Sequence, residues 1–499
     1  MAKLHALLQP YVPNSDDPFD YVKAAHLLSR ATFGGKPEEI DAVLAMGPGK
    51  AVDALLDFPD AAADEQSKTD VPDLSAVGDG YPATFEARAK LLMGKTQEER
   101  QQINQMLMQK NREAMAATLQ WWLKRMSDGP YPLQEKLTFF WHGHFTTSAR
   151  DERAASLMWQ QNETLRRNAA GNFRTFVKEV SRDPAMLDYL NNQQNRKAHP
   201  NENYARELME LFTLGIGNYT EDDIKEAARA FTGWAHDGDD FIFRKFDHDY
   251  GQKSFFGRSG NFDGDDVIEL ILQNKACAPY VARCLLNYFV EDEPDPELCT
   301  SLGGVIREND YDLRPALQVL FKSKLFYSPS IIGGQIKSPV QMVVGTIRLL
   351  DVEPRNQGSV VAALEQMGQV PFAPPNVKGW PGGRIWINTS TVFVRYNTAV
   401  WLAGGGMPVT GGRGGVARFV GGARGEGPGR FGGPQFNPKP SGNSHAEIVD
   451  AWVKRLIQRP ITEERKKVLM DSLGDRPEFE GSVKKMIQLI VSMPEYQLC

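Results

Sequence analysis

Apolar side chains recur at helical spacing along most of this chain, and no regular alternation of strands and helices interrupts them. In the segment 20–57, for example, Ala24, Leu27, Leu28 and Ala31 repeat at intervals of three and four residues. Similar patterns predict helices over 85–128, 151–167, 172–190, 201–214 and 220–232, and again over 265–290, 313–322, 340–350 and 357–369. The sequence therefore predicts a mainly α, multi-helical globular protein.

One stretch departs from this pattern. Over 234–262, aromatic residues alternate with charged residues and glycine, which predicts a small antiparallel β-hairpin or an extended region. Further along, Ser338 is followed by Pro339, and this pair predicts the start of a helix, with the serine as N-cap and the proline in the first helical position.

The length of 499 residues exceeds what one hydrophobic core usually supports, which is roughly 250–300 residues. We expect a main helical region over 1–402, which can comprise two packed units and carries an irregular insertion at 58–84. A glycine-rich flexible insertion follows over 403–443, because such a composition cannot bury a core. A C-terminal helical unit over 444–499 is then expected to pack on the main region.

Charge and hydropathy narrow the classes of partner. The net charge is -6 and no strongly basic domain stands out, so no nucleic-acid partner is expected. No run of 18 apolar residues occurs, which predicts that no segment spans a membrane. Pro10 and Pro13 interrupt the apolar patch near the start, so the sequence as it stands predicts no secretory signal and a cytoplasmic location; a leader removed beforehand would leave export open.

The four cysteines do not form a recognisable framework. Cys277, Cys284, Cys299 and Cys499 include no C-x-x-C pair, so we expect no disulfide scaffold. Cys277 and Cys284 are seven residues apart and share a helix face, which is typical of small buried apolar residues.

Two histidines stand two residues apart in the segment 135–145, in a chain that has only eight. An extended backbone would place His142 and His144 on one side, where both could bind a metal ion. A helix would point them about 200° apart. Gly143 between them favours a helix that ends there, in which case one histidine could cap backbone carbonyls instead.

A second group of polar residues lies at 199–214. On a helix, Asn203, Glu207 and Glu210 form a stripe beside an apolar face, while Glu202 and Arg206 are four apart and can pair. Desolvated carboxylates have raised pKa values, which suits general acid–base chemistry or a metal site. The alternative is a solvated helix face with ordinary ion pairs.

Two other histidines are ambiguous. His248 stands between Asp247 and Asp249, as a metal ligand with carboxylate neighbours would, but a tight polar turn closing at Gly251 has the same sequence. His26 stands four residues before Arg30 and could equally be a hydrogen-bonded core residue.

Six motifs together resemble one known family. They are the segments 25–34, 140–145, 201–211, 228–234, 248–253 and 336–340, and in this order they resemble the bacterial domain-of-unknown-function 1800 family over about residues 20 to 400. The resemblance implies a bacterial protein and little about its chemistry. Many members look exported, and the family often has histidine where this chain has Phe212.

Three hypotheses follow for the function. The first is an enzyme, either a hydrolase or an oxidoreductase, with a polar pocket that could be built around a divalent metal ion from His142, His144, Glu207, Glu210 and His248. The second is a metal-free hydrolase that uses Glu202, Glu207 or Glu210, with Arg206 beside them, for acid–base catalysis. The third is a non-catalytic scaffold or carbohydrate-binding protein that uses Trp234, Trp380, Trp386 and nearby aromatic residues.

The three hypotheses predict different geometries. A clustered pocket of histidine and glutamate would favour the first. Carboxylates that face each other at about 5–10 Å without a histidine nearby would favour the second. Histidines and glutamates scattered on separate surfaces would favour the third.

Overall fold

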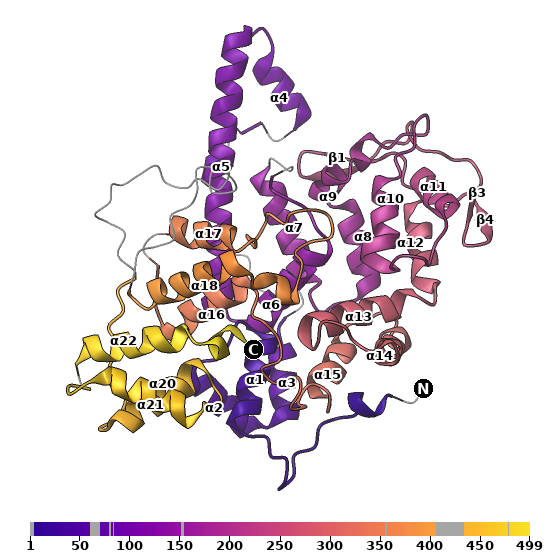
Figure 1. Ribbon diagram of the computed structural model, residues 1–499. Helices are drawn as coiled ribbons and strands as arrows, with labels where there is room; N and C mark the ends of the chain where they lie inside the picture. Colours follow the sequence, from indigo (N-terminus) through magenta and orange to yellow (C-terminus); the bar gives the residue numbers. More distant parts are fainter. Residues whose placement is uncertain are drawn as a thin grey trace.

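The computed structural model describes residues 4–59, 70–78, 81–82, 84–150, 154–354, 357–405, 434–477 and 479–499, and the fold is mainly α, as predicted (Figure 1). Most of the glycine-rich stretch 403–443 and much of the segment 58–84 lie outside the described residues. The domain boundaries drawn from the sequence stay predictions.

One hydrophobic cluster gathers helices from the first two thirds of the chain around one face of α6. These helices are α1 (Tyr21–Ala31), α2 (Pro37–Met46), α3 (Pro48–Leu56), α6 (Pro132–His144), α8 (Phe173–Arg182), α9 (Pro184–Tyr189), α10 (Asn203–Glu207), α11 (Glu221–Ala230), α12 (Gly264–Gln273), α13 (Cys277–Phe289), α14 (Pro296–Glu308) and α15 (Arg314–Lys322). A π-helical turn, Leu208–Thr213, continues α10 directly.

A second hydrophobic cluster joins α5 and α7 to the helices of the last third. Its members are α5 (Gln97–Asp128), α7 (Ala155–Arg167), α16 (Pro339–Leu350), α17 (Gln357–Gln366), α18 (Thr389–Leu402), α20 (His445–Leu456), α21 (Glu463–Leu473) and α22 (Glu480–Val491). Helix α6 adds Leu137 and Trp141 to the first cluster and Phe139 to the second, and α7 adds Leu165 to the first and Leu157 to the second. The two clusters therefore meet at α6 and α7.

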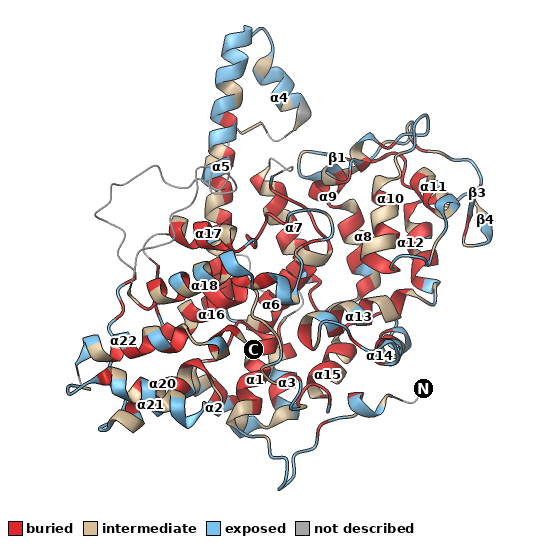
Figure 2. Cartoon of the chain, in the orientation of Figure 1, coloured by how far each residue is buried: buried red, intermediate tan, exposed pale blue. Residues whose placement is uncertain are grey.

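Helices α4 (Phe85–Leu92) and α5 form an arm that projects from the body (Figure 1). Its outer part is mostly exposed, whereas the other end of α5 is buried in the second cluster (Figure 2). No helix among the described residues is both long enough and apolar enough to cross a membrane.

Apart from isolated bridges, the β-strands of the described residues lie in the stretch 234–262, where the sequence predicts them. Strand β1 (Trp234–Asp237) pairs antiparallel with β2 (Asp240–Phe243), with Trp234 opposite Phe243. Strand β3 (Lys253–Phe255) pairs antiparallel with β4 (Arg258–Gly260).

The segment before α16 pairs with residues far along the chain. An antiparallel bridge joins Ile336 to Leu498, and the N–H of Lys337 donates to the carbonyl of Gln497 at 2.9 Å. Helix α16 then starts as predicted, because the Ser338 hydroxyl accepts the N–H of Gln341 and Pro339 occupies the first turn. This pairing holds residues 335–338 against α6 and α13, where the main candidate site lies.

Candidate functional site

His142 is a buried structural residue. Its side chain is enclosed by the rings of Trp122, Phe372 and Trp380, at centroid distances of 5.4–5.5 Å. Nε2 accepts the backbone N–H of Phe372 at 2.9 Å. Burial lowers the pKa of His142 to about 3, so the ring is neutral, and its accepting nitrogen is engaged in holding the loop at 372.

His144 ends α6 on another face, as the helical alternative predicts. Its Nε2 lies 2.9 Å from the carbonyl oxygen of Phe212, and because a carbonyl only accepts, Nε2 carries the proton. Burial lowers the pKa of His144 to about 4. The neutral ring therefore presents Nδ1 as an acceptor, and the residue lines a cavity described below.

His248 and His26 belong to local structure. Nδ1 of His248 donates to the carbonyl of Thr232 at 2.8 Å, which fixes the polar turn that was the alternative to a ligand. His26 is a core residue whose Nε2 lies 3.0 Å from the carbonyl of Phe326, and burial lowers its pKa well below the usual value.

The glutamates near α10 do not face these histidines. Glu202 pairs with Arg206 at 3.1 Å, as the spacing predicts, and Arg206 also pairs with Glu221 at 2.8 Å. Glu210 accepts the hydroxyl of Tyr219 at 2.8 Å. Burial and the nearby charge of Glu210 raise the pKa of Glu207.

Glu207 lines a cavity of about 800 Å³ together with Asn203, Asp188 and His236. Nε2 of His236 lies 3.0 Å from Asp188 Oδ1. Among the described residues, no group of three or more histidine, cysteine, aspartate or glutamate side chains is placed to hold a metal ion. The structure thus does not bring the five predicted ligands together: one faces this cavity, one faces a second cavity, and the others lie in local structure.

The second cavity, of about 290 Å³, lies between α6 and α13. We call it the α6–α13 cavity. One face of α6 forms a wall, at the helical spacing of Lys136, Phe139, Phe140, Gly143 and His144. The facing wall of α13 is formed by Tyr280, Cys284, Asn287 and Tyr288. Each wall combines apolar rings with hydrogen-bonding groups.

Two loops complete the α6–α13 cavity. The segment 335–341 contributes Gln335, Ser338 and Gln341, and the segment 377–386 contributes Trp380 and Trp386 among others. Val377 lines both cavities, so the start of the second loop forms part of the wall of each.

Glycines allow the loop at 377–386 to approach its neighbours closely. Gly379 has a φ of 77°, and a Cβ there would lie 2.2 Å from the carbonyl oxygen of Gly143. Gly383 has a φ of 62°, and a Cβ there would lie 2.3 Å from the carboxylate of Asp292. The loop that carries both tryptophans is therefore fitted against the end of α6 and the segment after α13.

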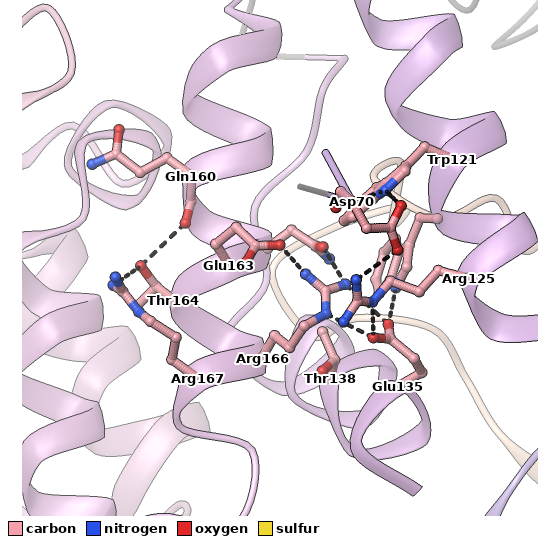
Figure 3. A network of polar contacts seen from close by, with 12 residues as sticks. Asp70, Trp121, Arg125, Glu135, Thr138, Gln160, Glu163, Thr164, Arg166 and Arg167 are labelled. Atoms are coloured by element: carbon pink, nitrogen blue, oxygen red, sulfur yellow. Dashed lines mark hydrogen bonds and ion pairs between the residues drawn. The ribbon is translucent and has the colours of Figure 1, made fainter. Parts of the chain in front are cut away.

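A buried ionic network orients α6. Glu135 lies between two guanidinium groups, with Arg125 at 2.5 Å and Arg166 at 2.8 Å (Figure 3). Burial alone would raise the pKa of Glu135, but these two arginines more than offset it and hold the pKa below its usual value. Successive residues of an α-helix point about 100° apart, so Lys136 faces a different side of α6 from Glu135. On that side it lines the cavity.

Lys136 is the site residue that the sequence predictions missed. Its side chain is 4% exposed, and Nζ donates a hydrogen bond to Gln341 Oε1. The spacing of 136, 139, 140, 143 and 144 was a usable signal, because it places one lysine on an otherwise largely aromatic helix face.

Comparison with known proteins agrees with this arrangement of motifs. A sequence model of the family described as "Protein of unknown function (DUF1800)" matches residues 26–498. The chain belongs to the DUF1800 family. No curated protein and no solved structure matches this DUF1800 member. The match extends beyond the predicted 20–400 to the helices α20–α22, and it covers every segment that lines the α6–α13 cavity.

Proposed function

We propose that this protein binds a small polyhydroxylated ligand, of the size of a monosaccharide, in the α6–α13 cavity. The observation that carries the proposal is that Trp380 and Trp386 line the same cavity, among polar side chains from separate segments. Flat indole rings offer apolar faces to the C–H groups of a sugar, and the polar groups can satisfy its hydroxyls.

The size of the cavity suits such a ligand. Pockets for small molecules usually measure about 300–1,000 Å³, and 290 Å³ lies at the lower limit of that range. The third tryptophan of the carbohydrate-binding hypothesis, Trp234, lies elsewhere: it is 4% exposed and packs against Phe231 and Phe241.

Polar groups in the cavity offer both donors and acceptors. Gln369 accepts the N–H of Val340 through Oε1 at 2.9 Å, so its orientation is fixed with the amide nitrogen as a donor. His144 offers the acceptor Nδ1, and Lys136 offers an amine. Such a mixed set matches hydroxyl groups, which donate and accept.

The positions of the predicted acidic and histidine residues also favour binding over the two enzyme hypotheses. Glu202 and Arg206 form a partly exposed ion-pair group with Glu221, and Glu210 bonds Tyr219. Glu207 and His144 line different cavities. Glutamates and histidines that do not share one pocket fit a scaffold or carbohydrate-binding protein better than an enzyme with a common His/Glu site.

The test is to titrate the protein with a panel of monosaccharides and to monitor binding by tryptophan fluorescence and by calorimetry. At least one sugar should give a saturable response. Replacing Trp386 by alanine should weaken that binding about tenfold or more, because a stacking face is lost. The control is Phe393→Ala, which removes a 64% exposed ring of α18 that does not line the cavity. A panel without a saturable response, or equal affinity in the Trp386 variant, would refute the proposal.

A further inference from the structure

Lys136 occupies an unusual position for a lysine. The side chain is almost fully buried, it lines the α6–α13 cavity, and Nζ lies 5.0 Å from the ring centroid of Phe33 and 5.5 Å from that of Tyr288. Buried lysines are normally paired with a carboxylate, because an isolated buried charge is costly.

The polar partner of Lys136 is a neutral amide. Gln341 receives the hydrogen bond from Nζ through Oε1, while its Nε2 donates to the carbonyl of Ser29 at 2.5 Å. The second bond fixes the orientation of the amide, so that its oxygen faces the amine. An uncharged amine satisfies this acceptor as well as an ammonium does, because it still has N–H groups to donate.

No carboxylate among the described residues forms an ion pair with Nζ of Lys136. The adjacent Glu135 is held by Arg125 and Arg166. Burial lowers the pKa of Lys136 to about 7. A negative charge at Cys499 raises this pKa, and the positive charge of Arg30 in α1 lowers it further. At neutral pH the free amine is then about a thousandfold more abundant than at an ordinary lysine.

We propose that Lys136 forms a Schiff base with the carbonyl carbon of an open-chain sugar held in the α6–α13 cavity. This inference rests on the proposed function, since it names the reactive form of the same ligand class. A neutral, buried lysine amine at the wall of a small polar cavity is the arrangement that carbonyl chemistry requires.

The reaction needs no oxidant or reductant. The lone pair of Nζ attacks the carbonyl carbon, a C–N bond forms, and the π electrons of the carbonyl move to its oxygen. This oxygen takes the first of the two amine protons and becomes a hydroxyl. The C–O bond then breaks, the nitrogen lone pair forms the C=N bond, and the second amine proton joins the departing hydroxide, so that one water is released.

Tyr288 is placed to help this step. Its ring lies beside Nζ and lines the cavity, and burial raises the pKa of Tyr288 above its usual value of 10.0. The hydroxyl therefore stays protonated at neutral pH and can donate a hydrogen bond to the carbonyl oxygen as negative charge develops there.

The test uses glycolaldehyde, a small hydroxylated aldehyde, with cyanoborohydride to reduce the imine at pH 7. Peptide mass spectrometry should find the reduced adduct at Lys136 at least about tenfold sooner than at Lys124, an exposed lysine of α5. Lys136→Arg should lose that adduct. Earliest labelling at surface lysines, with Lys136 unmodified, would overturn the inference.

Gln341→Glu is a second variant that retains the amine. A carboxylate facing Nζ should raise the pKa of Lys136, which lowers the labelling rate at pH 7 by about tenfold or more and restores it at higher pH. A purely structural Lys136 would show no such shift in its pH profile. Unchanged labelling in this variant would contradict the inference.

The outcomes separate the inference from the proposed function. A saturable fluorescence response to sugars without an adduct at Lys136 would refute the Schiff base and leave sugar binding intact. An adduct at Lys136 without any response to sugars would refute the proposed ligand class while supporting a reactive amine.

Discussion

Replacing Lys136 by methionine should change how stability depends on pH. The pKa of Lys136 is about 7 in the folded protein against 10.5 as its ordinary value. Between these two values the unfolded chain binds one more proton than the folded chain, so unfolding takes up a proton. Raising the pH opposes that uptake, and the free energy of unfolding therefore rises with pH in this window.

The magnitude follows from the two pKa values. Each pH unit well inside the window contributes about 1.4 kcal/mol, and between pH 7 and pH 9 the contribution of Lys136 sums to about 2 kcal/mol. Methionine has a similar length and does not titrate. The variant should therefore be more stable than the wild type at pH 7, and its advantage should shrink by about 2 kcal/mol by pH 9.

The assay is urea denaturation of both proteins at several pH values from 6.5 to about 9. Lys337, whose pKa burial lowers to about 8, titrates in both proteins and cancels in the comparison. Lys124→Met is the matched control, because Lys124 is exposed. Parallel stability curves for wild type and the Lys136 variant would refute the reasoning, since they would mean that the amine titrates alike in the folded and unfolded chains.

Three other substitutions test the architecture of the site. Glu135→Gln should destabilise the protein by about 3–5 kcal/mol, measured by denaturation, because two buried guanidinium groups lose the buried carboxylate that they share and keep only the more exposed Asp70 and Glu163. Glu163→Gln at a half-buried position should cost much less. Gly379→Ala should weaken ligand binding in calorimetry, because its Cβ displaces the tryptophan loop, whereas Gly304→Ala in α14, where a Cβ has space and the residue does not line the cavity, should bind normally. Ser338→Ala should cost about 1 kcal/mol in denaturation by removing the N-cap of α16, and an unchanged midpoint would count against that role.

Local rules predicted much of the fold because they act within a few residues. Ser338 and Pro339 start α16, and α6 ends at His144, directly after Gly143. The segment 85–128 is predicted as one long helix; the structure has two helices there, α4 and α5, separated by a short break. Periodicity and capping residues are sufficient to predict such helices, because both signals depend only on residues close together in the sequence.

Two helices were missed for tertiary reasons. Helix α14 contains Gly303 and Gly304, and adjacent glycines weaken any helical prediction. A Cβ at Gly303 would lie 2.6 Å from the backbone nitrogen of Pro279, so glycine allows α13 and α14 to approach closely. Helix α18 is rich in threonine and valine, which are typical of strands. In the folded protein, packing of its buried residues against neighbouring helices outweighs this local preference.

The candidate site was the least predictable part. Histidines and glutamates are the natural candidates in a sequence because these residue types perform much of catalysis. In the structure, however, His142 accepts a backbone N–H and His248 donates to a backbone carbonyl, and no local pattern reveals these partners. The π-helical turn after Glu207 also alters the assumed α-helical stripe, since it adds a residue to the turn that holds Glu210. The pairing of Lys136 with Gln341 joins residues 205 positions apart.

The bridge between Ile336 and Leu498 has a consequence for biosynthesis. The segment that it holds, 335–338, forms part of the α6–α13 cavity, yet the partner residues 497–499 are translated more than 150 residues later. Contacts of such long range form slowly, and domains generally begin to fold while the ribosome is still working. Nascent chains that already contain α1 to α16 must therefore carry an unfinished cavity with exposed aromatic walls, and a ligand-competent protein exists only after residues 497–499 have left the ribosome.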